Sequence, residues 1–227
     1  MTGVQAGDPR DLAPQYVLPL VVRVERADPP ARTDALEGAA QAVLTLLTDP
    51  RTEGDGDWAE AVRAWSDARI RKVVRRARGA EWRRAEALDG ITVTHGTAEV
   101  RVFPPVPLDA WPRDLARLQV SGTDFDDPDP PAPPAPGVPV LWLNPAVELT
   151  AGKAMAQVGH AAQLGLVALD EADARKWRDD RFPVAVRVAD RSRWEDLLAR
   201  DLPVVRDAGF TEVAPGTCTA VAEILRA

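Results

Sequence analysis

The sequence has one cysteine, two histidines and no long apolar run, and each of these shortages excludes a class of protein. The lone Cys218 rules out an internal disulfide framework or a cysteine-rich metal site, and it fits a reducing compartment. His95 and His160 lie in different halves without metal-ligand spacing, so we expect no metal and no cofactor. No segment approaches the roughly 20 consecutive apolar residues of a membrane helix, and residues 1–15 lack a signal-peptide run. We therefore expect a cytoplasmic protein that does not enter a membrane.

Positive charge is carried almost entirely by arginine, which makes each lysine conspicuous. The net charge of -7 argues against a uniformly basic surface for nucleic acid, although a local patch stays open. The only lysines are Lys72, Lys153 and Lys176. Where a compact ammonium group replaces the usual guanidinium, a chemical role for that group is favoured.

The segment 150–162 places three polar side chains on one face of an otherwise small and apolar helix. Lys153, Gln157 and His160 are spaced i, i+4 and i+7, which predicts a single stripe. Thr150 is typical of an N-cap. Lys153 would then stand in the first helical turn, where the helix dipole disfavours a cation by about 0.3 to 1 kcal/mol. A compensating role for this lysine is therefore expected.

A proline-rich stretch over residues 124–139 divides the chain. It can form neither a helix nor a sheet ladder, so we interpret it as an extended linker between residues 1–123 and 140–227. A proline-motif ligand for an SH3-like partner is the less favoured alternative. Past the linker, strands and helices alternate, which predicts an α/β fold. We expect strands at 138–143, 182–188, 204–207 and 217–224, and helical segments at 151–169, 173–177 and 192–200.

The first half repeats this plan weakly but in the same order. Residues 20–23 followed by 38–41 mirror residues 141–144 followed by 159–162. In that register the polar positions of the second half fall on unlike residues: Lys153 maps to Arg32, His160 to Ala39, Asp207 to Thr94 and Thr211 to Ala98. The repeat predicts a duplicated domain whose first copy keeps the scaffold and has lost the polar set. Two unrelated α/β halves are the alternative.

A second polar group surrounds the last predicted turn. Asp207 falls at the carboxyl end of a predicted strand, where open α/β sheets usually carry their chemistry. Thr217 and Thr219, two apart on a strand, are expected to face one way, with Cys218 facing the other as a small core residue. A carboxylate, two hydroxyls and a lysine could orient a water and stabilise an oxyanion. A turn-capping role for Asp207 is the structural alternative.

These two motifs carry a family resemblance. Residues 152–162, together with 207–211 and 214–216, are similar to the signatures of the archaeal and eukaryotic-type (class 2) peptidyl-tRNA hydrolases, and the likeness runs over 138–227. It implies a four-stranded mixed sheet flanked by helices and metal-free cleavage of the ester between a peptide and the 3' end of tRNA. By the same resemblance, Lys153, Asp207, Thr211 and Thr219 match catalytic positions, and Gln157, His160 and Thr217 match polar positions near the site.

Two departures and one basic run bear on the tRNA partner. Asn144-Pro145-Ala146 stands where members of that family often have Arg-Asn-Asp, and Ala151 stands where they often have a lysine. The cationic run 69–78 in the first half is typical of a solvated basic face, with a tRNA-backbone patch as the alternative. Its candidate phosphate contacts are Arg71, Lys72, Arg75 and Arg76.

The resemblance also bears on assembly and activity. Because members of the family commonly form homodimers, a duplicated chain is expected to be a monomeric pseudo-dimer or to pair again as a homodimer. We expect peptidyl-tRNA as the partner and tRNA recycling as the role. The alternatives are a non-catalytic tRNA- or protein-binding descendant and hydrolysis of another ester- or amide-linked conjugate.

Overall fold

The computed structural model describes residues 10, 13–207 and 213–224 of the chain. The first half carries a mixed sheet in the order β2-β1-β4-β3, with β1 parallel to β2 and antiparallel to β4. A short strand β5 also pairs with β1. The elements of this half are β1 (Tyr16–Arg23), α1 (Arg32–Leu47), the 3-10 turn η2 (Pro50–Thr52), α2 (Ala59–Asp67), β2 (Lys72–Ala77), α3 (Gly79–Glu86), β3 (Ile91–His95), β4 (Ala98–Val102), β5 (Val106–Pro107) and α4 (Arg113–Ala116).

The second half carries a four-stranded mixed sheet in the order β7-β6-β9-β8. Strand β6 is parallel to β7 and antiparallel to β9, and β8 is antiparallel to β9. If the strands of each half are numbered along the chain, both sheets have the strand order 2-1-4-3. The α/β class predicted from the sequence is confirmed. The elements are β6 (Val140–Leu143), α5 (Ala151–Ala168), α6 (Glu171–Asp179), β7 (Ala185–Val188), α7 (Arg191–Ala199), β8 (Val204–Arg206) and β9 (Cys218–Glu223).

Three strands of the second half start later than the sequence predicts. The strand expected at 138–143 begins at Val140. The strand expected at 182–188 begins at Ala185, because Arg181 and Phe182 have φ values of 63° and 56° and form a turn. The strand expected at 217–224 begins at Cys218. Thr217 precedes it, and its hydroxyl donates to the Ala214 carbonyl at 2.7 Å. Thr217 therefore lies just outside the strand that carries Thr219.

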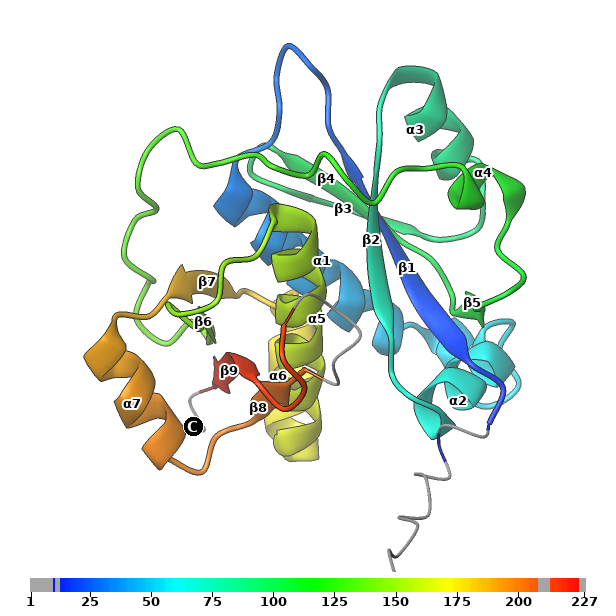
Figure 1. Ribbon diagram of the computed structural model, residues 1–227. Helices are drawn as coiled ribbons and strands as arrows, with labels where there is room; N and C mark the ends of the chain where they lie inside the picture. Colours follow the sequence, from blue (N-terminus) through cyan, green and yellow to red (C-terminus); the bar gives the residue numbers. More distant parts are fainter. Residues whose placement is uncertain (1–9, 11–12, 208–212, 225–227) are drawn as a thin grey trace, which may run out of the picture.

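Helices α1 and α5 pack against each other between the two sheets (Figure 1). Small residues permit the close approach: a Cβ on Gly159 would stand 3.1 Å from Val43 Cγ2 and 3.2 Å from Lys72 Cδ. Each helix covers the last two strands of its own sheet and also touches the edge strand of the other half, α5 at β2 and α1 at β7. One apolar core consequently contains residues of both halves.

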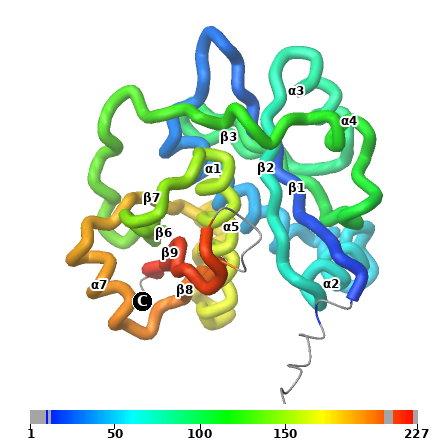
Figure 2. Tube along the Cα trace, viewed as in Figure 1, coloured from blue at the N-terminus to red at the C-terminus, as the bar shows by residue number. Residues whose placement is uncertain are grey.

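The segment 124–139 forms no helix or strand, and it is held against both halves as it crosses between them (Figure 2). Phe125 is buried in the shared core. Asp127 accepts hydrogen bonds from the Thr33 backbone N–H and hydroxyl, each at 2.7 Å, at the start of α1. The carbonyl of Ala132 accepts from Arg187 Nε at 3.1 Å. The linker is therefore anchored to both halves at Phe125, Asp127 and Ala132.

Among the described residues, no helix combines the length and apolar character needed to cross a membrane.

Candidate active site

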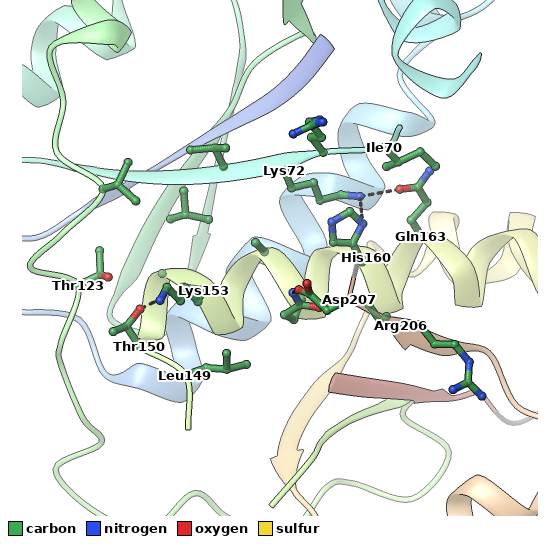
Figure 3. Close-up of a pocket in the computed structure, with 18 of the residues that line it drawn as sticks. Ile70, Lys72, Thr123, Leu149, Thr150, Lys153, His160, Gln163, Arg206 and Asp207 are labelled. Carbon is green, nitrogen blue, oxygen red and sulfur yellow. Dashed lines mark hydrogen bonds between the residues drawn. The ribbon is translucent and has the colours of Figure 1, made fainter. Parts of the chain in front are cut away.

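A cleft of about 920 Å³ lies between the two halves (Figure 3). The polar stripe of α5 lines it, with β2 and residues 120–124 of the first half on one side and β8 on the other. Thr150 caps α5 by accepting from the Lys153 backbone N–H at 3.5 Å. Gly152 lets the helix start approach Thr123, whose Oγ1 would stand 2.7 Å from a Cβ at that position. The helix that bears the stripe is thus fixed against the first half.

Asp207 is held by a buried chain of hydrogen bonds. Gln157 Nε2 donates to Asp207 Oδ2 at 3.0 Å, and Thr219 Oγ1 donates to Gln157 Oε1 at 2.5 Å. The three side chains are 7%, 6% and 0% exposed for Asp207, Gln157 and Thr219. The threonine hydroxyl orients the amide, and the amide orients the carboxylate. Because such a group is already aligned, it needs little reorganisation when it acts.

The backbone around Asp207 is also fixed. Its N–H donates to the Thr217 carbonyl at 2.9 Å, and its carbonyl accepts from the Gly216 N–H at 2.7 Å. Thr217 therefore contributes through its main chain and through the turn hydroxyl already described. Lys153 and Asp207 line the same cleft, as a shared site requires. Thr211 lies outside the described residues.

His160 lies further along α5 and meets a lysine from the first half. Lys72 Nζ is 3.1 Å from His160 Nδ1 and donates to Gln163 Oε1 at 2.6 Å. It also stands 4.9 Å from the ring centre of Trp65. Burial lowers the pKa of Lys72 well below its ordinary value. Burial and then the charge of Lys72 lower the pKa of His160 well below its own. A neutral imidazole at this point is favoured over a second cation.

The cationic run 69–78 does not form one exposed face. Side chains alternate along β2, so neighbouring cations point to opposite sides of the sheet. Lys72 is only 7% exposed and lines the cleft, so it is not part of a solvated basic face. Arg75 donates to the Leu118 carbonyl at 2.5 Å and covers the Trp111 ring. Arg76 donates to the Ser121 carbonyl at 2.8 Å. Arg71 lines the cleft.

Sequence reasoning missed the contribution of the first half to this cleft. The rarity of lysine was the available signal for Lys72. Gln163 lies three residues after His160 on the same face of α5, so the helical spacing also indicated its place in the cleft. Nothing local indicated that β2 would lie beside α5.

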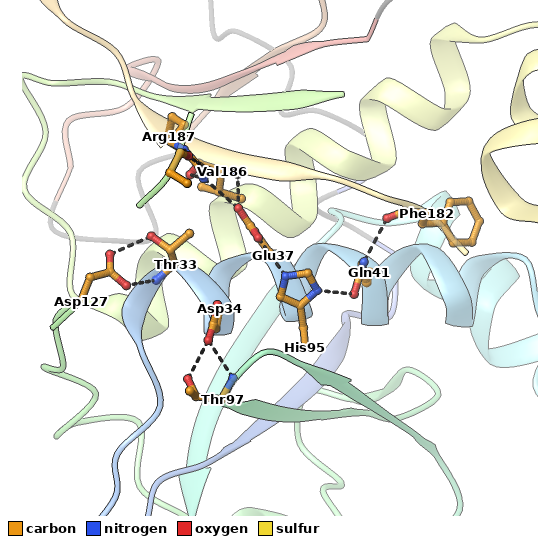
Figure 4. A network of polar contacts seen from close by, with 11 residues as sticks. Thr33, Asp34, Glu37, Gln41, His95, Thr97, Asp127, Phe182, Val186 and Arg187 are labelled. Carbon is orange, nitrogen blue, oxygen red and sulfur yellow. Dashed lines mark hydrogen bonds and ion pairs between the residues drawn. The ribbon is translucent and has the colours of Figure 1, made fainter. Parts of the chain in front are cut away.

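A different polar network fills the interface on the α1 side (Figure 4). Glu37 Oε2 contacts His95 Nε2 at 2.9 Å, while its Oε1 accepts from the Val186 N–H at 2.9 Å and from Arg187 Nη1 at 2.8 Å. His95 Nδ1 is 3.0 Å from Gln41 Oε1. Burial opposes ionisation of Glu37, yet the bonds from His95, Val186 and Arg187 together lower its pKa. The bond to Glu37 raises the pKa of His95.

The turn after β3 closes on the start of α1. Asp34 accepts from the Thr97 N–H and hydroxyl at 2.7 Å each. Gly96 has a φ of +51°, and a Cβ there would stand 2.3 Å from Asp34 Oδ2. Only Gly96 and Thr97 separate β3 from β4, whereas residues 207–217 separate β8 from β9. The turn at this place in the first half is therefore much shorter than the segment that contains Asp207.

The described residues contain no group of three or more His, Cys, Asp or Glu side chains that could hold a metal ion. The fold and cleft define an α/β protein with an oriented carboxylate and a lysine at the edge of a mixed sheet.

Comparisons with known proteins identify the family. The family model for "Peptidyl-tRNA hydrolase PTH2" matches residues 138–223. A peptidyl-tRNA hydrolase of Pyrobaculum aerophilum is 38% identical over 87 residues, which cover 33% of this chain and 72% of that relative. The chain belongs to the peptidyl-tRNA hydrolase PTH2 family.

Proposed function

We propose that the protein hydrolyses the ester between a peptide, or an N-blocked aminoacyl group, and the 3' end of tRNA, and so recycles tRNA. The observation that carries the proposal is the Thr219–Gln157–Asp207 chain of hydrogen bonds, which opens on the same cleft as Lys153. Membership of the PTH2 family supports the choice of substrate. A fold alone would not, since one fold can host many reactions.

The residues of the cleft divide into two roles. Asp207 orients the attacking water, and Lys153 stabilises the developing oxyanion or the terminal phosphate. Thr219 is fully buried and bonded to Gln157, so it acts through that amide as a positioning residue. Gln157 is engaged at both ends of its amide, which favours orienting Asp207 over binding substrate. His160 lines the cleft beside these residues, and we assign it to contact with the substrate.

The test is release of labelled N-acetyl-aminoacyl groups from tRNA by purified protein. We expect Lys153→Ala and Asp207→Asn each to lower kcat/KM by about 100-fold or more, in the range of one lost electrostatic or general-base contribution. Lys176→Ala, an exposed lysine on α6, is the matched control and keeps wild-type activity. Equal activity in wild type and both variants overturns the assignment.

We propose further that the chain is a fused pseudo-dimer. The shared strand order of the two sheets, and the reciprocal contacts of α5 with β2 and of α1 with β7, support a duplication. In this proposal the second half is catalytic and the first half is a supporting copy. The α1–α5 contact is already satisfied inside one chain, so we expect a monomer in light scattering.

The competing function is a tRNA- or protein-binding descendant without turnover. The observation that favours it is Asn144, which closes its own turn by accepting from the Ala146 N–H at 2.8 Å instead of offering a cation. If the wild-type protein hydrolyses peptidyl-tRNA, the hypothesis of a non-catalytic binding protein is excluded. Turnover of a simple peptide ester at an equal rate favours a different conjugate as substrate.

A further inference from the structure

The cleft has apolar lining that the hydrolytic roles do not use. Four large hydrophobic side chains line it while remaining partly in solvent: Ile70, Leu108, Val120 and Leu164 are 38%, 43%, 50% and 38% exposed. Only Leu164 belongs to the second half. Exposed apolar side chains that gather around one cavity mark a binding surface more often than isolated ones do.

Polar and then apolar side chains of α5 line the cleft from its start towards its far end. Lys153 lies in the first turn, Gln157 and His160 follow, and Leu164 lies near the far end. At 1.5 Å per residue, the 11 positions from Lys153 to Leu164 span about 16 Å. An extended chain of about 3.4 Å per residue would fit four to five residues in that length. The groove is therefore long enough for a short peptide whose ester end lies at Lys153.

The wall formed by β2 offers an unpaired strand edge. Strand β2 is the outermost strand of its sheet. The carbonyls of Arg71 and Ala77 face β1, where they accept from the Leu18 N–H and the Val24 N–H, each at 2.9 Å. Alternation directs the backbone groups of Lys72, Val74 and Arg76 to the outer edge, where the Arg76 N–H donates to the Gln119 carbonyl at 2.9 Å.

Within the described part of the chain, Lys72 and Val74 have no backbone partner on that outer edge. Both residues line the cleft. A strand edge with free N–H and C=O groups is a template for an added extended segment, with main-chain hydrogen bonds giving affinity and neighbouring side chains giving selectivity.

We propose that the groove between β2 and α5 binds the peptide portion of the ester substrate as an added extended strand, with its apolar side chains against Ile70, Leu108, Val120 and Leu164. The inference rests on the proposed function, since that function places the ester beside Lys153 and Asp207. It assigns to the first half the recognition of hydrophobic peptides, while the second half carries the hydrolysis.

Two substrates on the same tRNA test the selectivity. N-acetyl-Leu-Leu-tRNA and N-acetyl-Gly-Gly-tRNA are compared with the full chain and with Leu108→Asp and Val120→Asp. We expect wild type to prefer the leucine substrate, and each variant to raise KM for it by about tenfold with kcat little changed, because a leucine side chain loses its apolar contact. The glycine substrate is affected less.

Val167→Asp is the matched control, because Val167 is 77% exposed on the same helix as Leu164 and does not line the cleft. It leaves both KM values unchanged. Equal KM for the two substrates in wild type, or the same effect from Val167→Asp as from the groove variants, overturns the proposal.

A binding measurement separates this proposal from the proposed function. The free peptide N-acetyl-Leu-Leu-Leu is added to isotope-labelled wild-type protein, and amide hydrogen exchange is followed by NMR. We expect exchange at Lys72 and Val74 to slow, while Val73 and Arg75, already directed to β1, serve as internal references. If wild type cleaves neither tRNA substrate but this protection appears, the function fails and the groove stands. If cleavage occurs and the Lys72 and Val74 amides do not respond, the groove assignment alone is wrong.

Discussion

Lys72 Nζ lies 3.1 Å from His160 Nδ1, and this contact joins β2 of the first half to helix α5 of the second. When Lys72 is protonated, its ammonium group can only donate, so Nδ1 accepts and the ring proton of a neutral His160 resides on Nε2. Gln163 Oε1 takes a second ammonium proton. The first half thereby sets the tautomer of a side chain in the cleft.

Lys72→Met tests this relationship. Removing the ammonium abolishes one of the two causes that lower the pKa of His160 and leaves the other, burial, in place. We expect the pKa of His160 to rise toward its ordinary 6.5 without passing it, and the Nε2–H tautomer to lose its preference. Nitrogen-15 NMR titration of the ring measures both. Lys176→Met, on exposed α6, is the control, and an unshifted titration in Lys72→Met contradicts the assignment.

Thr219→Val tests the positioning chain to Asp207. The change keeps the side-chain shape and removes the donor to Gln157 Oε1, so the amide and then the carboxylate lose their alignment. We expect kcat to fall by about tenfold, the equivalent of one buried hydrogen bond of about 1.4 kcal/mol, with KM little changed. Thr219→Ser restores the hydroxyl and most of the rate. Thr48→Val, whose hydroxyl bonds the Leu44 carbonyl at the end of α1, controls for a general loss of packing. A kcat that Ser does not recover contradicts the role.

Local patterns predicted the second half well because its signals are short in sequence. The i, i+4, i+7 spacing from Lys153 and the Thr150 cap located α5 to within a residue at each end. The sequence predicts too early a start for the strand that begins at Ala185. The positive φ values of Arg181 and Phe182, which form the preceding turn, leave no signal in the hydrophobic pattern. The basic run does not form one cationic face, because side chains alternate along β2 and Lys72 and Arg75 point to opposite sides of the sheet.

Contacts between the halves could not be predicted in the same way. The ion pair of Glu37 with Arg187 joins residues 150 positions apart, and the bond of Gln41 to the Phe182 carbonyl joins residues 141 apart. Neither is encoded in a local period. Such pairs follow from the α1–α5 packing and from the placement of β7 beside α1, which only the folded chain reveals.

Glu37→Gln tests how much the interface depends on that ion pair. Glu37 is 8% exposed and its Oε1 lies 2.8 Å from Arg187 Nη1, so neutralising it leaves a mostly buried guanidinium without its counter-charge. We expect the free energy of unfolding to fall by about 2 to 3 kcal/mol, below the 3 to 5 kcal/mol of a fully buried pair. Glu171→Gln removes an exposed ion pair with Arg175 and costs under about 0.5 kcal/mol. Equal losses in urea unfolding contradict the buried role.

His95 makes the same interface sensitive to pH. The pKa of His95 is raised above 6.5 in the folded chain, mainly by the bond to Glu37. The folded chain therefore binds this proton more tightly than the unfolded chain does. The stability from His95 is complete below pH 6.5 and is lost as pH rises through the folded pKa. The pKa of Glu37 is lowered from 4.5, so its contribution is lost only as pH falls through its folded pKa.

The measurement compares wild type with His95→Gln in urea between about pH 5.5 and 8.5, where Glu37 stays ionised. We expect the difference in unfolding free energy to be largest at the acidic end and to shrink as pH rises. His160, with its lowered pKa, has the opposite sign and destabilises both proteins as pH falls below 6.5. It therefore cancels in the difference. A difference that grows with rising pH contradicts the charged His95–Glu37 pair.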